Sequence, residues 1–354
     1  MPTWFKSKHQ SILGIDISST SVRIIELSGS GNHYSVLAYA STIIPESFME
    51  GYRIKETQKV ADLIMQLLKS NHFSTKAVAI AVPDSVAISK IIQINDGLNE
   101  QDIEEIVLSE ADNYIPYPID EINIDFNVLG AAKKNSAMLD VLIVASKSEN
   151  ITNRVEAIKG AGLEAIVVDV ESYAVERAAQ LLANDLPANG INRNIAILDI
   201  GALNTHLYVL NNMKIIFTRD EEFGGMQLVE AVMQQYKMER QEAMLAIEKN
   251  TLPKDAEETV FVSFSELILL QVRRALQFFF SSSNQVVIDH LFLAGGVAKL
   301  PGIDKSIQDQ INIPTSIVNP LAHMTISKSV NAETISHDAS KLLVVCGLAL
   351  RLKE

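Results

Sequence analysis

Short apolar runs that end in polar turns dominate the N-terminal part of the chain. Their length and their content of β-branched residues are typical of strands, whereas one segment repeats apolar residues every three or four positions, as on one face of a helix. We predict strands at Ile12–Ile17, Val22–Leu27, Tyr34–Ile44 and Ala77–Val82, and a helix at Glu56–Ser70.

Residues 84–163 repeat the alternation of strands and helices on a smaller scale. An acidic amphipathic helix begins after Asn99, which is suited to cap it, and ends before Pro116 and Pro118. These residues contain enough elements to form a small α/β subdomain inserted in the first lobe. We predict strands at Val86–Ile94, Ile122–Leu129 and Ala137–Ala145, and helices at Asn99–Tyr114 and Ser148–Lys159.

The second half of the chain begins with strands like those of the first half. The segment at residues 185–190, which contains Pro187 and Gly190, marks the boundary between the two halves. We predict a strand at Ala165–Val170, a hairpin at Ile195–Leu210 and Lys214–Arg219, a strand at His290–Leu293, and helices at Glu171–Leu182, Gly225–Tyr236, Arg240–Lys249, Val260–Ser281, Ile303–Gln310 and Lys341–Arg351.

This order of elements predicts an α/β protein of two related lobes, and 354 residues suffice for two domains. The predicted parts are the core of the first lobe (11–83), the inserted subdomain (84–163), the return of the first lobe with a connecting helix (164–190), the second lobe (191–340), and a C-terminal helix that packs on the first lobe (341–354).

Composition and charge exclude several classes of function. Hydrophobic residues make up 47% of the chain, which is typical of a globular protein. The net charge of −13 argues against a nucleic-acid partner. Only Trp4 and Phe5, beside Lys6 and Lys8, form a local segment that could touch lipid. The single Cys346, the absence of a long apolar run and the absence of a signal peptide predict a protein of the cytosol, which could sit beneath a membrane through a partner.

Two predicted strands end in an aspartate that is followed by small or hydroxyl-bearing residues. Asp16 precedes the turn Ser18–Ser21, and Asp199 precedes Gly201-Ala202-Leu203-Asn204-Thr205. A carboxylate at a strand end can hold Mg²⁺ through water, and hydroxyl and backbone N–H groups can donate to phosphate oxygens. Arg23, on the next strand, could neutralise a phosphate. A single such turn is more often structural, but two that open related lobes favour a nucleotide site.

Two glycine pairs lie farther along the second half. Gly295 and Gly296 follow a strand and precede Val297, and Gly224 and Gly225 open a predicted helix. Without side chains, such turns let a flat base or a ribose approach the backbone. Each pair alone is more often a structural turn, so it supports a nucleotide site only together with the aspartate turns.

Together these motifs resemble the phosphate-1, phosphate-2 and adenosine elements of the actin-like ATPase superfamily. A finer resemblance, to the family of type IV pilus assembly proteins called PilM, covers nearly the whole chain. It rests on residues 14–23 (GIDISSTSVR), 110–118 (EADNYIPYP) and 168–178 (VDVESYAVERA). The resemblance implies an actin-like, ribonuclease H-like fold whose inserted subdomain is of the type found in the division protein FtsA.

The resemblance also implies ATP and Mg²⁺ as ligands. Asp16 and Asp199 would organise the magnesium ion, and Glu171 would orient the attacking water. An acid that the helix dipole favours is the alternative reading of Glu171. The nucleotide contacts that the resemblance implies are Ser18, Ser19, Thr20, Arg23, Gly201, Asn204, Thr205, Gly224, Gly225, Gly295, Gly296 and Val297.

Some positions depart from the superfamily pattern. Ser18 stands where a glycine is common, and Ala202 and Leu203 interrupt a turn that is often all glycine. These residues leave less room for backbone around a phosphate, so we expect ATP binding with at most slow hydrolysis. The acidic and basic residues expected near the ribose are poorly defined, and Glu242 and Lys249 are loose candidates.

The function that the resemblance implies is a cytoplasmic adaptor of the type IV pilus machine. It would bind the short cytoplasmic N-terminal tail of a PilN-like inner-membrane protein, in a groove between the first lobe and the inserted subdomain, and change state with nucleotide. Other pilus platform or motor proteins and a second copy of the chain are further candidate partners. Two alternatives stay open: a sugar or acetate kinase, for which we find no catalytic-base motif, and a filament-forming actin homologue.

Overall fold

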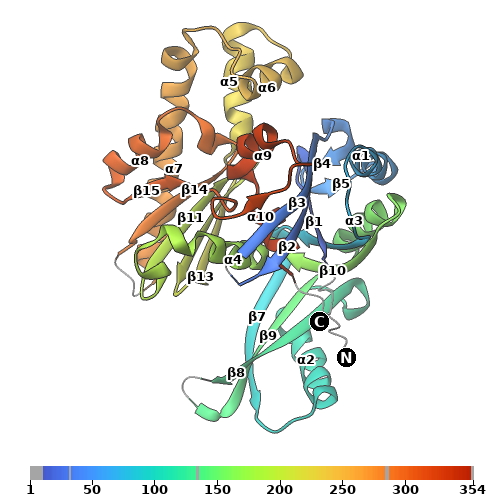
Figure 1. Ribbon diagram of the computed structural model, residues 1–354. Helices are drawn as coiled ribbons and strands as arrows, with labels where there is room; N and C mark the ends of the chain where they lie inside the picture. Colours follow the sequence, from blue (N-terminus) through green and yellow to red (C-terminus); the bar gives the residue numbers. More distant parts are fainter. Residues whose placement is uncertain (1–10, 32, 133–134, 284–286, 352–354) are drawn as a thin grey trace, which may run out of the picture.

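The computed structural model describes residues 11–31, 33–132, 135–283 and 287–351, and it consists of two lobes and a module that projects from the first lobe (Figure 1). The predicted α/β architecture of two related lobes is confirmed. The segment with Trp4, Phe5, Lys6 and Lys8 lies outside the described residues. Within the described ranges, no helix is both long enough and apolar enough to cross a membrane.

The first lobe is a sheet with the strand order β10-β6-β1-β2-β3-β16 and helices on both faces. Alternate residues of β1 point to opposite faces, so Leu13 and Ile15 pack against α1 and α3 while Gly14 lies against α10. The bounds are β1 Leu13–Ile17, β2 Ser21–Ser30, β3 His33–Ile43, β6 Ala77–Val82, β10 Glu164–Val170, β16 Thr325–Ile326, α1 Thr57–Ser70, α3 Ser148–Gly160, α4 Glu171–Ala179 and α10 Leu343–Ala349. Two short strands, β4 Met49–Glu50 and β5 Arg53–Ile54, lie beside α1.

The second lobe repeats the pairing of the first. In each lobe three consecutive strands pair antiparallel, and a later strand lies parallel to the first of them. The carboxyl ends of β1 and β11 therefore occupy equivalent places in the two lobes. The bounds are β11 Asn194–Ile200, β12 Thr205–Asn211, β13 Lys214–Glu221, β14 His290–Gly295, β15 Thr315–Ile317, α5 Gly225–Tyr236, α6 Arg240–Glu248, α7 Val262–Ser282, α8 Ile303–Ile311 and α9 Ala332–Asp338.

The projecting module is a three-stranded sheet, in the order β7-β9-β8, with α2 on one face (Figure 1). Its elements are β7 Ala87–Asn95, β8 Ile122–Ala132, β9 Asn135–Lys147 and α2 Glu100–Tyr114. Asn99 caps α2 as predicted, because its side-chain oxygen accepts a hydrogen bond from the backbone N–H of Asp102 at 3.0 Å.

Helix α3, which we expected within the inserted subdomain, packs against α1 in the core of the first lobe. Its apolar residues Ala157 and Ile158 are fully buried there. We therefore propose that the module ends with β9. The connecting helix also differs from the prediction, because α4 ends at Ala179 and the chain continues to Asp185 in tighter 3₁₀ turns.

Helix α10 packs between β1 and α4, in the core that the two lobes share. Side chains of β10 and α4 hold its C-terminal half and the residues that follow it. The guanidinium of Arg177 donates to the carbonyl of Gly347 at 3.0 Å, and the carboxylate of Asp169 pairs with both Arg177 and Arg351. The last helix of the chain thus joins the first lobe to the connecting helix.

Candidate functional site

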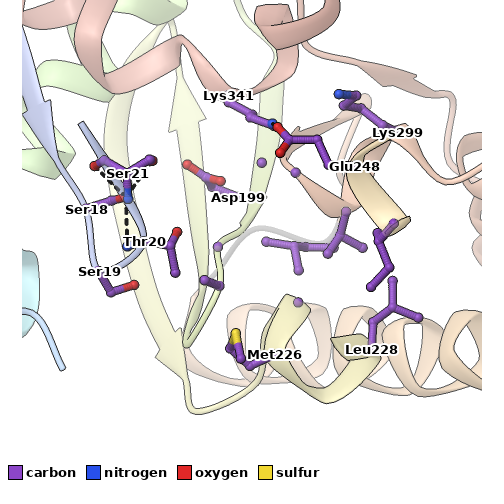
Figure 2. A pocket seen from close by; sticks show the side chains of 18 of the residues that line it. Ser18, Ser19, Thr20, Ser21, Asp199, Met226, Leu228, Glu248, Lys299 and Lys341 are labelled. Atoms are coloured by element: carbon purple, nitrogen blue, oxygen red, sulfur yellow. Dashed lines mark hydrogen bonds and ion pairs between the residues drawn. The ribbon is translucent and has the colours of Figure 1, made fainter. Parts of the chain in front are cut away.

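A cavity of about 480 Å³ lies between the two lobes, where β1 and β11 end. Figure 2 shows Asp199 facing the serine-rich turn of the first lobe across this space. The structure thus brings most of the predicted site residues together. The predicted residues that line the cavity are Asp16, Ser18, Ser19, Thr20, Arg23, Glu171, Asp199, Gly201, Gly225, Gly295, Gly296 and Val297.

The other three predicted residues, Asn204, Thr205 and Gly224, shape the second turn and are not among the residues lining the cavity. The buried hydroxyl of Thr205 donates to the carbonyl of Phe223 at 2.7 Å. The backbone carbonyl of Asn204 accepts from the N–H of Gly201 at 2.9 Å. Gly224 lies so close to the turn that a Cβ atom there would be 2.6 Å from the carbonyl oxygen of Gly201. We assign these three residues to the support of the turn.

Ser18 closes the first turn with its own side chain. Its hydroxyl oxygen accepts hydrogen bonds from the backbone N–H groups of Ser21, at 3.1 Å, and Thr20, at 3.4 Å (Figure 2). In a turn with glycine at this position, those N–H groups would be open to a phosphate. The hydroxyl groups of Ser19 and Thr20 remain as donors at the cavity.

Each lobe places a carboxylate opposite a basic residue on the neighbouring strand. Asp16 lies opposite Arg23 in the β1–β2 ladder, and their side chains form an ion pair at 3.0 Å. Asp199 lies opposite His206 in the β11–β12 ladder. Burial raises the pKa of Asp199, and the charge of Asp16 adds to that effect while His206 and Arg23 oppose it. The two hairpins therefore deliver matching pairs of charges to the cavity.

His206 is a residue of the cavity wall that the sequence interpretation missed. Its Nδ1 atom lies 2.7 Å from a carboxylate oxygen of Asp220 on β13. Burial alone would lower the pKa of His206, but the hydrogen bond with Asp220 and the charge of that carboxylate help to outweigh burial and raise the pKa to about 9. The signal in the sequence was the hairpin register, which places a residue seven positions after Asp199 directly across from it.

Glu171 begins α4 and faces the cavity from the first lobe. Burial, with the charge of Asp16, raises the pKa of Glu171 to about 8 against the opposing effect of His206. Arg154 also opposes the rise; its buried guanidinium donates to the carbonyls of Ile17 and Tyr52, at 3.0 Å each. A carboxyl group with this pKa is largely protonated at neutral pH, which limits its use as a general base.

The raised pKa of Glu171 makes stability depend on pH. Because the folded-state pKa of about 8 exceeds the ordinary value of 4.5, stability from the protonated carboxyl group is complete below pH 4.5 and is lost as the pH rises through 8. We expect Glu171→Gln to be more stable than the wild type by about 1–3 kcal/mol at pH 8.5 and nearly equal at pH 5. Urea unfolding at the two pH values measures this difference. An equal difference at both pH values would contradict the raised pKa.

Apolar side chains line part of the cavity, and we call this part the apolar slot. Its residues include Met226 and Leu228 of α5 (Figure 2), Met244 and Ile247 of α6, and Val297. Apolar walls of this kind suit a flat purine base. The remaining slot residues are Val229, Phe261, Leu300 and Pro301.

Charged residues border the slot at its mouth. Glu248, Lys299 and Lys341 line the cavity, and the Lys341 ammonium lies 3.4 Å from a Glu248 carboxylate oxygen. Burial and the charge of Lys341 lower the pKa of Lys299 to about 8. The candidates Glu242 and Lys249 were wrong as cavity residues, because neither lines it. The helical spacing of Met244, Ile247 and Glu248 identifies the correct face of α6.

A group of possible metal ligands, Glu248, His337 and Asp338, also lies at this mouth. Lys341 already pairs with both carboxylates, and the Lys299 ammonium contacts the His337 ring. We keep Asp16 and Asp199 as the candidate magnesium ligands, because they lie at the ends of equivalent strands in the two lobes and both line the cavity.

Comparison with known proteins gives a consistent result. The family model of "Type IV pilus assembly protein PilM" matches residues 14–353. A chain solved in a PilM–PilN type IV pilus biogenesis complex is 26% identical, with a TM-score of 0.79, over 97% of this chain and 98% of that one. The ethanolamine utilization protein EutJ from Carboxydothermus hydrogenoformans is 15% identical, with a TM-score of 0.58, over 99% of this chain and 90% of that one.

Proposed function

Because the chain belongs to the family of the type IV pilus assembly protein PilM, we propose that it is an adaptor of the pilus assembly platform that binds ATP with Mg²⁺ and a PilN-like partner. The observation that carries the nucleotide part is the interlobe cavity on which both aspartate turns converge. The 26% identity to a chain from a PilM–PilN complex supports the partner. The protein would lie in the cytoplasm and reach the inner membrane through that partner.

The cavity residues fit a magnesium nucleotide. Asp16 and Asp199 offer the oxygen ligands that Mg²⁺ prefers, at the ends of the two equivalent strands. The hydroxyl groups of Ser19 and Thr20 would donate to phosphate oxygens. The base would occupy the apolar slot beside Gly296, where nothing but the end of Lys341 lies within 4 Å of an added Cβ.

The same residues predict slow hydrolysis. Glu171 would orient the attacking water, but its pKa of about 8 keeps most of the carboxyl groups protonated at pH 7. Ser18 occupies two backbone donors that would otherwise stabilise a developing phosphate charge. An adaptor needs only the difference between nucleotide-bound and free states, so slow turnover is consistent with its role.

The proposed groove for the partner tail lies where the module meets α4. On β7, Ile92 and Ile94 pack under α2, so Ser89 and Ile91 face the other side of the sheet. Ser89 accepts a hydrogen bond from Tyr173 of α4 at 3.0 Å, and Ile91 is 53% exposed. This exposed face, which carries Ile91 and is bordered by the first lobe, could hold the side chains of a short peptide.

We expect Ile91→Glu to weaken binding of the tail peptide at least about tenfold, because a charge would replace an apolar contact. Fluorescence anisotropy with a labelled peptide of the cognate PilN-like N-terminal tail measures this effect. Leu267→Glu, on α7 of the second lobe, is the matched control, because Leu267 has a similar exposure of 46%. Equal loss in both variants, or in neither, would exclude the groove at β7.

A further inference from the structure

Asp84 lies at the base of the projecting module, where the chain passes from β6 into β7. The chain returns from the module to the first lobe at the end of β9. This returning segment is bonded to the segment that enters the module, because the hydroxyl of Ser146 donates to the carbonyl of Val86 at 2.8 Å. Ala87 and Ser146 are also partners in the β7–β9 ladder. The two segments that connect the module to the first lobe are therefore bonded to each other. A shift of Asp84, which lies in the first of them, acts directly on the module.

Each lobe donates one hydrogen bond to the carboxylate of Asp84. From the first lobe, the backbone N–H of Ser172 in α4 lies 3.3 Å from one carboxylate oxygen. From the second lobe, the hydroxyl of Tyr208 on β12 lies 3.2 Å from the other. The Asp84 side chain thus bridges the two lobes as well as marking the base of the module.

Both donors are neighbours of the cavity wall. Ser172 follows Glu171, which lines the cavity, and the next residue, Tyr173, donates to Ser89 on β7 of the module. On the other side, the ring of Tyr208 stacks on the ring of His206, which also lines the cavity, with 6.2 Å between the ring centroids. A movement of the cavity walls can therefore reach the module in two ways: through α4 from the first lobe and through β12 from the second lobe.

We propose that Asp84 is the coupling residue between the nucleotide cavity and the partner-binding module. This inference rests on the proposed function, since it requires a nucleotide in the cavity and a tail peptide on the module. A nucleotide that draws the lobes together would change the position of Tyr208 relative to Ser172. Because Asp84 is bonded to both, the base of β7 would move with them, and the exposed face of the module would change its angle to α4.

Two tyrosine-to-phenylalanine variants each remove one hydrogen bond and keep the aromatic ring. Tyr208→Phe removes the bond from the second lobe, and Tyr173→Phe removes the bond from α4 to Ser89. Tyr236→Phe is the matched control: its hydroxyl bonds to Asp255 and Thr259, in the second lobe and away from the module. The readout is the dissociation constant of the labelled tail peptide, measured without nucleotide and with a saturating non-hydrolysable ATP analogue and Mg²⁺.

For the wild type and Tyr236→Phe we expect nucleotide to change the peptide affinity about fivefold or more. In Tyr208→Phe the change should fall below about twofold, while the affinity for nucleotide alone stays within about threefold of the wild type. Tyr173→Phe should also reduce the change, because it removes the direct contact between α4 and β7. Should the buried Tyr208→Phe variant fail to fold, Tyr173→Phe still tests whether a movement of α4 reaches β7. Hydrogen exchange of β7 amides should respond to nucleotide in the wild type and less in Tyr208→Phe.

Full coupling in both variants would overturn the role of Asp84. A wild type that binds both ligands without any mutual effect would also overturn it, while leaving the adaptor function intact. A wild type that binds no nucleotide would refute the proposed nucleotide function and the coupling with it.

Discussion

Replacing Gly347 with alanine is expected to lower the free energy of unfolding by about 3 kcal/mol. Gly347 lies in α10, where the helix crosses α4, and an added Cβ would collide with the backbone carbonyl oxygen and Cα of Ala174. Backbone atoms in a packed core cannot move aside as a flexible side chain can. The steric cost exceeds the gain of about 1 kcal/mol that alanine normally brings to a helix.

Urea denaturation at constant pH measures this change through the midpoint at an unchanged slope. Gly296→Ala is the control, because its Cβ would lie 3.7 Å from the end of the flexible Lys341 side chain and its φ is −68°. We expect the control to shift the free energy of unfolding by less than about 1 kcal/mol. Equal stability of Gly347→Ala and the wild type would mean that α10 can withdraw from α4 at little cost.

Replacing Asp199 with asparagine is expected to weaken ATP binding about 10- to 100-fold in the presence of Mg²⁺ and little in its absence. The carboxylate is proposed to hold the ion through water, and the amide has nearly the same shape but no charge. Because burial raises the pKa of Asp199, its charge destabilises the free protein at neutral pH. The variant should therefore lose affinity for Mg-ATP without losing stability.

Isothermal titration with ATP, in Mg²⁺ and in EDTA, separates the two effects, and thermal unfolding without ligand measures stability. Asp304→Asn, in the first turn of α8 and away from the cavity, is the control for loss of one negative charge. Wild-type affinity of Asp199→Asn for Mg-ATP would remove Asp199 from the magnesium site. A loss of the same size in EDTA would indicate a role in binding the nucleotide itself.

Local pattern predicted much of the fold for a physical reason. The period of apolar residues, the prolines and the N-cap Asn99 act within a few residues, and Ala77–Val82 and Gly225–Tyr236 form a strand and a helix with the predicted bounds. The same locality explains why the sequence does not assign α3 to the first lobe or to the module. An amphipathic helix reveals that it has an apolar face, but not which of two neighbouring sheets covers that face.

For the candidate site, too, local features could be predicted from the sequence and features that depend on distant contacts could not. Aspartates at strand ends can be found in the sequence, since the strand and the polar turn that follows it depend on neighbouring residues, and two such turns in related lobes favour a nucleotide site. Whether a hydroxyl is free for a ligand is not readable: Thr205 bonds to the carbonyl of Phe223, eighteen residues away, and the Ser18 hydroxyl is occupied within its own turn. His206 and Glu248 reach the cavity through strand register and helix face, which require the neighbouring elements.

The sequence by itself determined the two related lobes, their aspartate turns and the glycine turn, because these depend on residue type and short spacing. Only the tertiary structure decided that the turns share one cavity, that a cation stands opposite each aspartate, and that Asp84 bridges both lobes at the base of the module. Tyr208 and Asp84 are 124 residues apart along the chain. Contacts over such separations depend on how whole sheets pack, and that packing leaves no local mark in the chain.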